Sequence, residues 1–155
     1  MPLKIKILTP GRARTAWLQA GIDEYIKRLT PYCRVSIVSV SDAACQKPAE
    51  RVIEEGQNLL RSIRDQDYVI ALDSAGQQPN SEALAASLTH WFEMGGSSIV
   101  FVIGGAYGLS EAVLQRAQER LSLSRLTFTH QMTQLLLLEQ CYRAFRIPRN
   151  EPYHK

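Results

Sequence analysis

The last residues of the sequence carry side chains that could bind a nucleotide base and move a proton. In "EPYHK", Tyr153 offers a flat ring for stacking on an unpaired base, and the His154 imidazole can take up a proton near neutral pH. Lys155 and Arg143 add positive charge that could contact phosphate or a deprotonated base. Two plainer interpretations stay open. Arg143 could simply pair with Glu139 on a helix surface, and a polar terminus is often disordered.

A second feature is the stretch "IVFVIGGAYGLS", where an apolar run enters two glycines and a third follows. Glycine lets a backbone come close to a ligand or to another segment. The order of the glycines does not match the dinucleotide fingerprint, and no lysine follows Gly108 as a phosphate-binding loop requires. The alternative is a tight turn between a strand and a helix, with Ser110 as the helix N-cap.

Hydrophobic periodicity predicts strands that alternate with helices. The expected strands are Leu3–Thr9, Cys33–Val40, Tyr68–Asp73, Ser97–Ile103 and Leu121–Phe128. The expected helices are Thr15–Leu29, Pro48–Ile63, one capped by Ser81 and ending at Gly95, Ser110–Leu121 and Gln131–Phe145. This alternation predicts an α/β fold with a parallel sheet covered on both faces. Ligands bind at the carboxyl ends of such strands, so the loops after Asp73, Ile103 and Phe128 should form one site.

The last expected helix, Gln131–Phe145, is apolar around well over half of its circumference. A surface helix needs only one apolar stripe. We therefore expect a second copy of the chain to cover the other side of this helix and form a homodimer.

Composition sets broad limits. With 155 residues, 45% hydrophobic and 21% charged, the chain is predicted to form one domain over residues 1–155. No signal peptide or membrane-spanning segment is apparent, and the three cysteines are expected to be free thiols in the cytoplasm. The three histidines lack metal-ligand spacing, so no metal is expected.

Four segments together resemble one known family. "FVIGGAYGLS", "LSLSRLTFTHQM", "LLLEQCYRAF" and "EPYHK" are similar to the SPOUT-class ribosomal RNA large subunit methyltransferase H family, and the resemblance covers the whole chain. It implies a parallel-sheet α/β knot fold with a C-terminal trefoil knot. It also implies transfer of a methyl group from S-adenosyl-L-methionine to N3 of a pseudouridine in large-subunit ribosomal RNA.

The resemblance also assigns residues. Cofactor contacts fall on Leu72, on Gly104 and on the run Leu123, Ser124, Arg125, Leu126, Thr127 and Phe128. Adenosylmethionine has no phosphates, so apolar walls and close backbone approach suit it, and the glycines are expected to face it. Arg143, Tyr153, His154 and Lys155 match the family's substrate end, with the tail reaching the active site across the dimer interface. Ala106 stands where the family often has proline or another small residue, and Thr129 stands where it often has proline, so both positions are expected to loosen the backbone without removing a catalytic atom.

RNA binding requires positive charge. The net charge is only +3, but residues 139–155 hold four basic against two acidic residues, and Arg12 and Arg14 follow the first strand. Two other functions stay open at this point: a non-catalytic RNA-binding module and a dinucleotide-binding oxidoreductase. The residues do not determine whether the substrate is free RNA, a ribosomal subunit or the whole ribosome.

Overall fold

The structure is a computed structural model that describes residues 2–11 and 15–154. Its strands are β1 (Leu3–Pro10), β2 (Cys33–Val40), β3 (Val69–Gln77), β4 (Ser98–Val102) and β5 (Glu119–Leu121). Its helices are α1 (Ala16–Leu29), α2 (Pro48–Arg61), α3 (Ser81–Met94), α4 (Glu111–Arg116) and α5 (His130–Arg146). The predicted alternation of strands and helices is confirmed.

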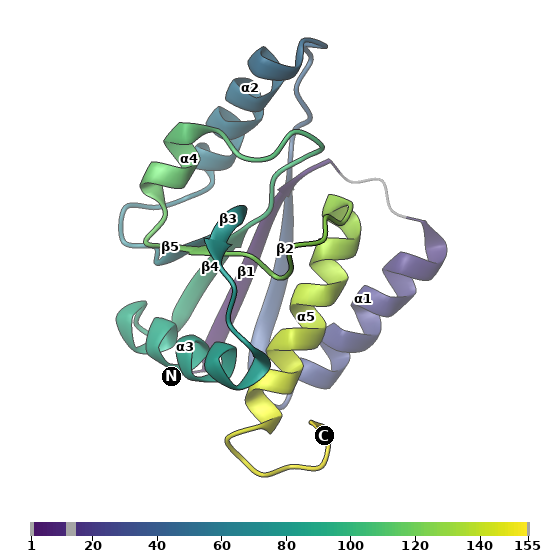
Figure 1. Cartoon of the computed structure of the whole chain (residues 1–155), viewed down its shortest axis with the longest axis vertical. Helices are drawn as coiled ribbons and strands as arrows, with labels where there is room; N and C mark the ends of the chain where they lie inside the picture. The colour runs from purple at the N-terminus through teal and green to yellow at the C-terminus, as the bar shows by residue number, and fades with distance from the viewer. Residues whose placement is uncertain (1, 12–14, 155) are drawn as a thin grey trace.

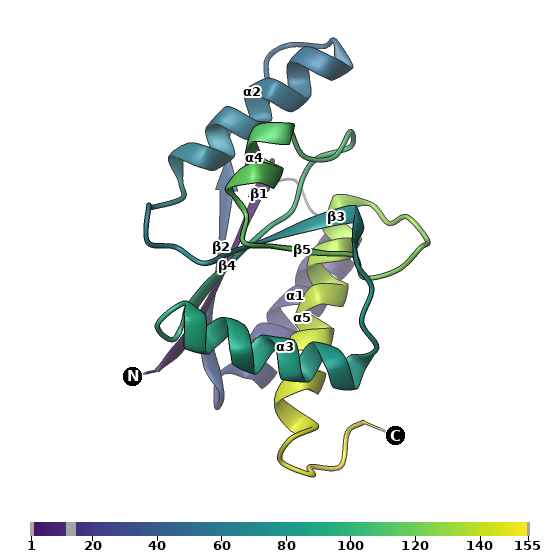
Figure 2. The same cartoon turned by 60° about the vertical axis from the view of Figure 1, so that its left-hand side comes forward.

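The strands form one sheet in the order β2-β1-β4-β3-β5, and every neighbouring pair is parallel. Helices α2 and α4 lie on one face, and α1, α3 and α5 lie on the other (Figures 1 and 2). The expected α/β fold with a parallel sheet covered on both faces is therefore confirmed. The trefoil knot implied by the resemblance stays a prediction.

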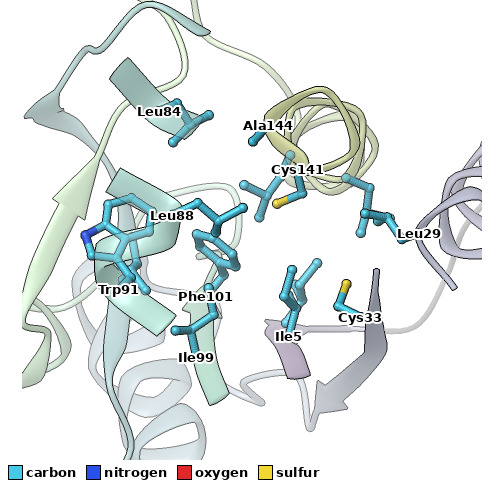
Figure 3. Close-up of a cluster of buried hydrophobic side chains, with 14 of the residues drawn as sticks. Ile5, Leu29, Cys33, Leu84, Leu88, Trp91, Ile99, Phe101, Cys141 and Ala144 are labelled. Carbon is cyan, nitrogen blue, oxygen red and sulfur yellow. The ribbon is translucent and has the colours of Figure 1, made fainter. Parts of the chain in front are cut away.

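The larger hydrophobic core lies between the sheet and helices α1, α3 and α5. Figure 3 shows side chains from both layers meeting there: Ile5, Ile99 and Phe101 from the strands, with Leu84, Leu88, Trp91, Cys141 and Ala144 from the helices. A smaller core under α2 and α4 is built from side chains such as Leu8, Leu59 and Val102. Both cores fix the strands, and so fix the loops at their carboxyl ends.

Three helix starts near these loops are capped by side chains, and at α5 Thr129 Oγ1 accepts from Met132 N at 3.2 Å. Ser110 Oγ accepts a hydrogen bond from the backbone N–H of Val113 at 3.3 Å, which confirms Ser110 as an N-cap. The expected cap at Ser81 is wrong: Asn80 is the N-cap of α3, and its side chain accepts from Ala83 N at 2.8 Å. Asn has a short acceptor that reaches the first turn as well as serine does.

The largest differences from the expected boundaries fall in β3, α4 and β5. Strand β3 runs on to Gln77, and α4 ends at Arg116 because Ala117 has an extended backbone. The segment that follows α4 turns into β5, in which Glu119 pairs with Ile70. Tertiary pairing with β3 therefore overrides the helical pattern of residues 117–121.

Residues 122–128 are irregular, although their alternation predicts a strand. The serines bond locally instead: Ser122 Oγ donates to the carbonyl of Ser124 at 3.0 Å, and Ser124 Oγ accepts from Leu126 N at 3.0 Å. Such local bonds offer the backbone an alternative to a sheet ladder. The segment is thus a loop at the end of β5.

Helix α5 packs between α1 and α3 on the sheet. Gly21 on α1 permits close approach, because a Cβ there would lie 3.3 Å from the Leu135 side chain. Helices of the same chain thus cover both flanks of α5. Its broad apolar surface therefore does not by itself require a second copy, and the homodimer stays a prediction that needs another argument.

Candidate active site

The segments near Asp73, Ile103 and Phe128 meet at one cavity of about 420 Å³. The expected loop after Asp73 is wrong, because Leu72, Asp73 and Ser74 lie within β3; the other two segments are loops that follow β4 and β5 at the carboxyl edge of the parallel sheet. The start of α5 contributes two polar residues to the lining, His130 and Thr133. The cavity is the site that the alternating pattern predicts.

Most residues that the sequence assigned to the cofactor line this cavity. They are Leu72, Gly104, Leu123, Ser124, Leu126, Thr127 and Phe128. Arg125 is exposed and is not among the lining residues. Leu126 is 73% exposed and Phe128 is 41% exposed, so two large apolar side chains stand open on this loop.

Close packing within the protein requires glycine at two positions of the glycine loop (residues 104–108). A Cβ on Gly104 would lie 2.7 Å from the carbonyl carbon and oxygen of Gly108, and one on Gly105 would lie 2.5 Å from Glu55 Oε2. Gly108 has a φ of +83°, a conformation that favours glycine. Protein atoms thus fill the space where a side chain at Gly104 or Gly105 would lie, and this packing shapes the loop. All three glycines line the cavity, so a ligand facing them stays a prediction.

Glu55, which supports the glycine loop from α2, is a buried carboxylate. Its side chain is 6% exposed and pairs with Arg51 Nε at 3.2 Å. Burial raises the pKa of Glu55, and the neighbouring Arg51 charge partly opposes that rise. The ion pair fixes the carboxylate beneath Gly105.

The lining of the cavity contains no lysine or arginine among the described residues. Its ionisable side chains are Asp73, Tyr107 and His130, and its walls are otherwise apolar side chains, hydroxyls and backbone. A phosphate-bearing ligand needs cations or anion-binding amides. This set of groups fits a ligand without phosphates better.

A second cluster gathers the predicted substrate-binding residues. Arg143 Nη2 pairs with Glu139 Oε1 at 2.6 Å, and Arg143 Nη1 contacts His154 Nδ1 at 3.1 Å. The Arg143 guanidinium also lies 4.8 Å from the centre of the Tyr153 ring. His154 Nε2 reaches Glu82 Oε1 on α3 at 2.8 Å. The ion pair that offered a plain interpretation of Arg143 is thus present, but as one part of a larger network.

Tyr153 is held firmly in this cluster. Its ring meets Tyr142 edge to face at 4.8 Å, and its hydroxyl lies 3.1 Å from both Tyr25 Oη and Glu139 Oε1. Burial raises the pKa of Tyr153, and the hydrogen bond with Tyr25 adds to the rise. The phenol therefore stays protonated at neutral pH.

Disorder is the wrong interpretation for residues 151–154. Glu151 accepts a hydrogen bond from Tyr32 Oη at 2.8 Å and pairs with Arg146 at 2.6 Å. The tail thus folds back onto α1, α3 and α5. Lys155, the fourth predicted residue of this group, lies outside the described residues.

The two groups of site residues lie at opposite ends of α5. His130 at the start of the helix lines the cavity, and Arg143 near its end joins the tail cluster. At about 1.5 Å per residue, the helix carries these two positions about 20 Å apart. Figure 1 likewise shows the C-terminus beyond the lower end of α5, away from the end where the helix begins. The cluster and the cavity of one chain are therefore separate.

The expected basic surface is partly neutralised. Arg146 pairs with Glu151 at 2.6 Å, and Arg149 Nε lies 3.9 Å from the same carboxylate. Arg12 and Arg14 fall outside the described residues. Within residues 2–11 and 15–154, no His, Cys, Asp and Glu group is arranged to hold a metal ion, and no helix is long and apolar enough to span a membrane.

Sequence reasoning missed several of these residues. Tyr107 and Thr133 line the cavity. Tyr107 lies between the glycines of "IVFVIGGAYGLS", so its position in the sequence could have identified it as a lining residue. Glu82 and Tyr25 join the tail cluster from distant helices. No local pattern marks either of them.

The fold is an α/β architecture with a cavity at the carboxyl edge of a parallel sheet, and solved structures share this fold. A probable methyltransferase from Bordetella pertussis superimposes with a TM-score of 0.57 at 11% identity, over 92% of this chain and 96% of that one. The tRNA (m1G37) methyltransferase from Aquifex aeolicus gives a TM-score of 0.54 at 14% identity, over 92% and 70%. At such low identity, these likenesses show the fold.

Sequence comparison identifies the family of the chain more specifically than the fold does. The family described as "Predicted SPOUT methyltransferase" matches residues 3–154. Proteins named ribosomal RNA large subunit methyltransferase H are 46% identical in both Symbiobacterium thermophilum and Listeria monocytogenes, over 99% of this chain and 100% of each relative. The chain belongs to the SPOUT methyltransferase family and is an enzyme.

Proposed function

We propose that this enzyme transfers a methyl group from S-adenosylmethionine to N3 of a pseudouridine in large-subunit ribosomal RNA. The cavity formed by β3 and the loops after β4 and β5 carries the proposal, because it lies in a chain whose relatives are named for this RNA. The enzyme would then work in the cytoplasm, on an assembled subunit or ribosome.

The cavity fits adenosylmethionine in size and chemistry. Its volume of about 420 Å³ suits a small-molecule site. Apolar side chains such as Leu72 and Leu123 can enclose the adenine, and the carboxylate of Asp73 suits a ligand that carries positive charge. A structure from Legionella pneumophila with the same fold has SAM bound, at a TM-score of 0.50 and 12% identity over 93% of this chain and 67% of that one. The bound cofactor supplies the methyl group as an electrophile.

The tail cluster would hold the base. Tyr153 offers its ring, Arg143 its charge, and His154 a nitrogen that can take a proton. N3 of the base must lose its proton before it can attack a methyl group, so these residues would position the base and manage that proton. Lys155 is expected to assist with phosphate.

The separation of the two groups supports a homodimer. One chain holds its cavity and its tail cluster about 20 Å apart along α5. A two-fold axis that sets two copies of α5 antiparallel would bring the cluster of one copy to the cavity of the other, twice. We therefore propose composite active sites, each built from both chains.

The two alternative functions are less well supported. A dinucleotide carries phosphates, and the described lining offers no cationic side chain for them. A non-catalytic RNA-binding module would need no cavity, and the relatives are named as methyltransferases.

Nucleoside analysis tests the function directly. Ribosomal RNA from cells lacking the gene should lose one N3-methylated pseudouridine, and purified protein with labelled adenosylmethionine should restore it. Unchanged RNA in the deleted strain would contradict the proposal.

Mixing two impaired variants, at a cofactor concentration too low for the weakened cavity to fill, tests the composite site. One variant lacks Tyr153–Lys155 but keeps its cavity, and the other carries Gly104→Ala but keeps its tail. Mixed dimers should contain one intact site and regain activity. If every active site lies within one chain, the mixture stays inactive.

A further inference from the structure

The hydrogen bonds of His154 fix its tautomer. An arginine guanidinium can only donate, so the contact of Arg143 Nη1 at 3.1 Å makes His154 Nδ1 an acceptor with a free lone pair. The proton of the neutral ring then lies on Nε2, which donates to Glu82 Oε1 at 2.8 Å. Glu82, from the first turn of α3, therefore sets which nitrogen can accept a proton.

This arrangement resembles that of a histidine general base whose ring is oriented by a carboxylate. A carboxylate that accepts from one imidazole nitrogen orients the ring and stabilises the imidazolium that forms when the other nitrogen gains a proton. Glu82 is 60% exposed in its side chain but is tied to His154, and that hydrogen bond lowers the pKa of Glu82. Glu82 is thus ionised at neutral pH and can balance a positive ring.

We propose that Glu82 is a positioning residue for proton removal from the substrate base, with His154 Nδ1 as the acceptor. This inference rests on the proposed function. His154 Nδ1 takes the proton from N3, and the electron pair left on N3 forms the new bond to the methyl carbon. The carbon–sulfur bond breaks with its electrons remaining on sulfur, and the imidazolium later releases its proton to water.

Arg143 must leave Nδ1 for this step. Its guanidinium also bonds Glu139 and lies over Tyr153, so it has partners that remain when the His154 contact opens. Among residues 2–11 and 15–154, the charged and titratable groups around His154 are Glu82 from α3, Arg143 and Glu139 from α5, and Tyr153 from the tail, with Tyr25 of α1 behind Tyr153. Glu82 is the carboxylate that bonds the ring directly.

Two substitutions separate this role from simple fastening of the tail. Glu82→Gln keeps an oxygen that accepts from Nε2 and removes the charge, whereas Glu82→Ala removes both. We expect Glu82→Gln to lower kcat for methyl transfer to ribosomes from cells lacking the gene by about tenfold, with KM unchanged. Its pH profile should shift, because the carboxylate that stabilises the imidazolium is gone, and Glu82→Asp should recover part of kcat. Glu93→Gln, at an exposed glutamate on the same helix, is the matched control.

Measurements that do not depend on activity complete the test. Long-range nitrogen–proton NMR of histidine-labelled protein should show the proton on Nε2 of His154, assigned with His154→Ala. S-adenosylhomocysteine should bind wild type and Glu82→Gln equally well. The inference is overturned by the opposite tautomer, or by Glu82→Gln with wild-type kcat, whether or not Glu82→Ala is impaired. Failure of the proposed function looks different, because the wild type itself would then leave ribosomal RNA unmethylated.

Discussion

Replacing Gly104 with alanine should damage both stability and cofactor binding. The added Cβ would lie 2.7 Å from the carbonyl of Gly108, whereas ordinary contacts begin at 3.4 Å. The backbone of Gly108 must therefore move by about 0.7 Å, and overpacking of this kind costs about 1–3 kcal/mol. The obstacle is backbone rather than a movable side-chain end, so relaxation is difficult.

The displaced loop lines the cavity, so ligand affinity should fall with stability. We expect S-adenosylhomocysteine to bind at least about tenfold more weakly, a loss of about 1.4 kcal/mol. Urea unfolding followed by fluorescence measures the first effect, and titration calorimetry measures the second. The buried Trp91 provides a suitable signal for the unfolding.

Gly96→Ala is the control for this substitution. Its added Cβ would have no neighbour within 4 Å, but its φ of +63° strains an alanine by about 1–2 kcal/mol. Gly96 lies in the turn between α3 and β4, so this variant should lose stability and keep its ligand affinity. If Gly104→Ala instead binds the ligand as tightly as wild type, the glycine loop does not form the cofactor site.

Three further predictions concern the tail, the response to alkali and assembly. Deleting Tyr153–Lys155 should reduce methyl transfer at least about 100-fold and leave S-adenosylhomocysteine affinity unchanged. If the truncated protein methylates RNA at the wild-type rate, the tail has only a structural role. The pKa of Tyr68 is raised from 10.0 to about 12, first by burial and then by its hydrogen bond to Glu119. Its stabilising contribution is complete below the unfolded pKa and is lost as pH rises from 10 through 12, so the free energy of unfolding should fall more steeply there in wild type than in Tyr68→Phe. Equal slopes would contradict this assignment. Sedimentation at micromolar concentration should show two chains, and a monomer there would remove the basis for a composite site.

The sequence by itself determined the order of elements and the place of the cavity. Apolar periodicity identifies β1, β2, β4 and the long helices, because burial of one face leaves a local pattern. The rule that ligands bind at the carboxyl ends of parallel strands then brought Asp73 and the loops after β4 and β5 together, although Asp73 lies within β3 rather than before a loop. Seven of the cofactor residues assigned by resemblance line the resulting cavity: Leu72, Gly104, Leu123, Ser124, Leu126, Thr127 and Phe128.

Only the tertiary structure decided the contacts between distant segments. Strand β5 was hidden within a helical pattern, because pairing of Glu119 with Ile70 outweighs the local preference. The need for glycine at position 105 comes from Glu55, which lies on another helix. The partnership of Glu82 with His154 joins residues 72 positions apart, and no spacing rule connects them. The sequence pattern indicates which faces of the helices and strands are apolar. Polar contacts at the surface, such as that of Glu82 with His154, depend on where the ends of the packed helices lie in space.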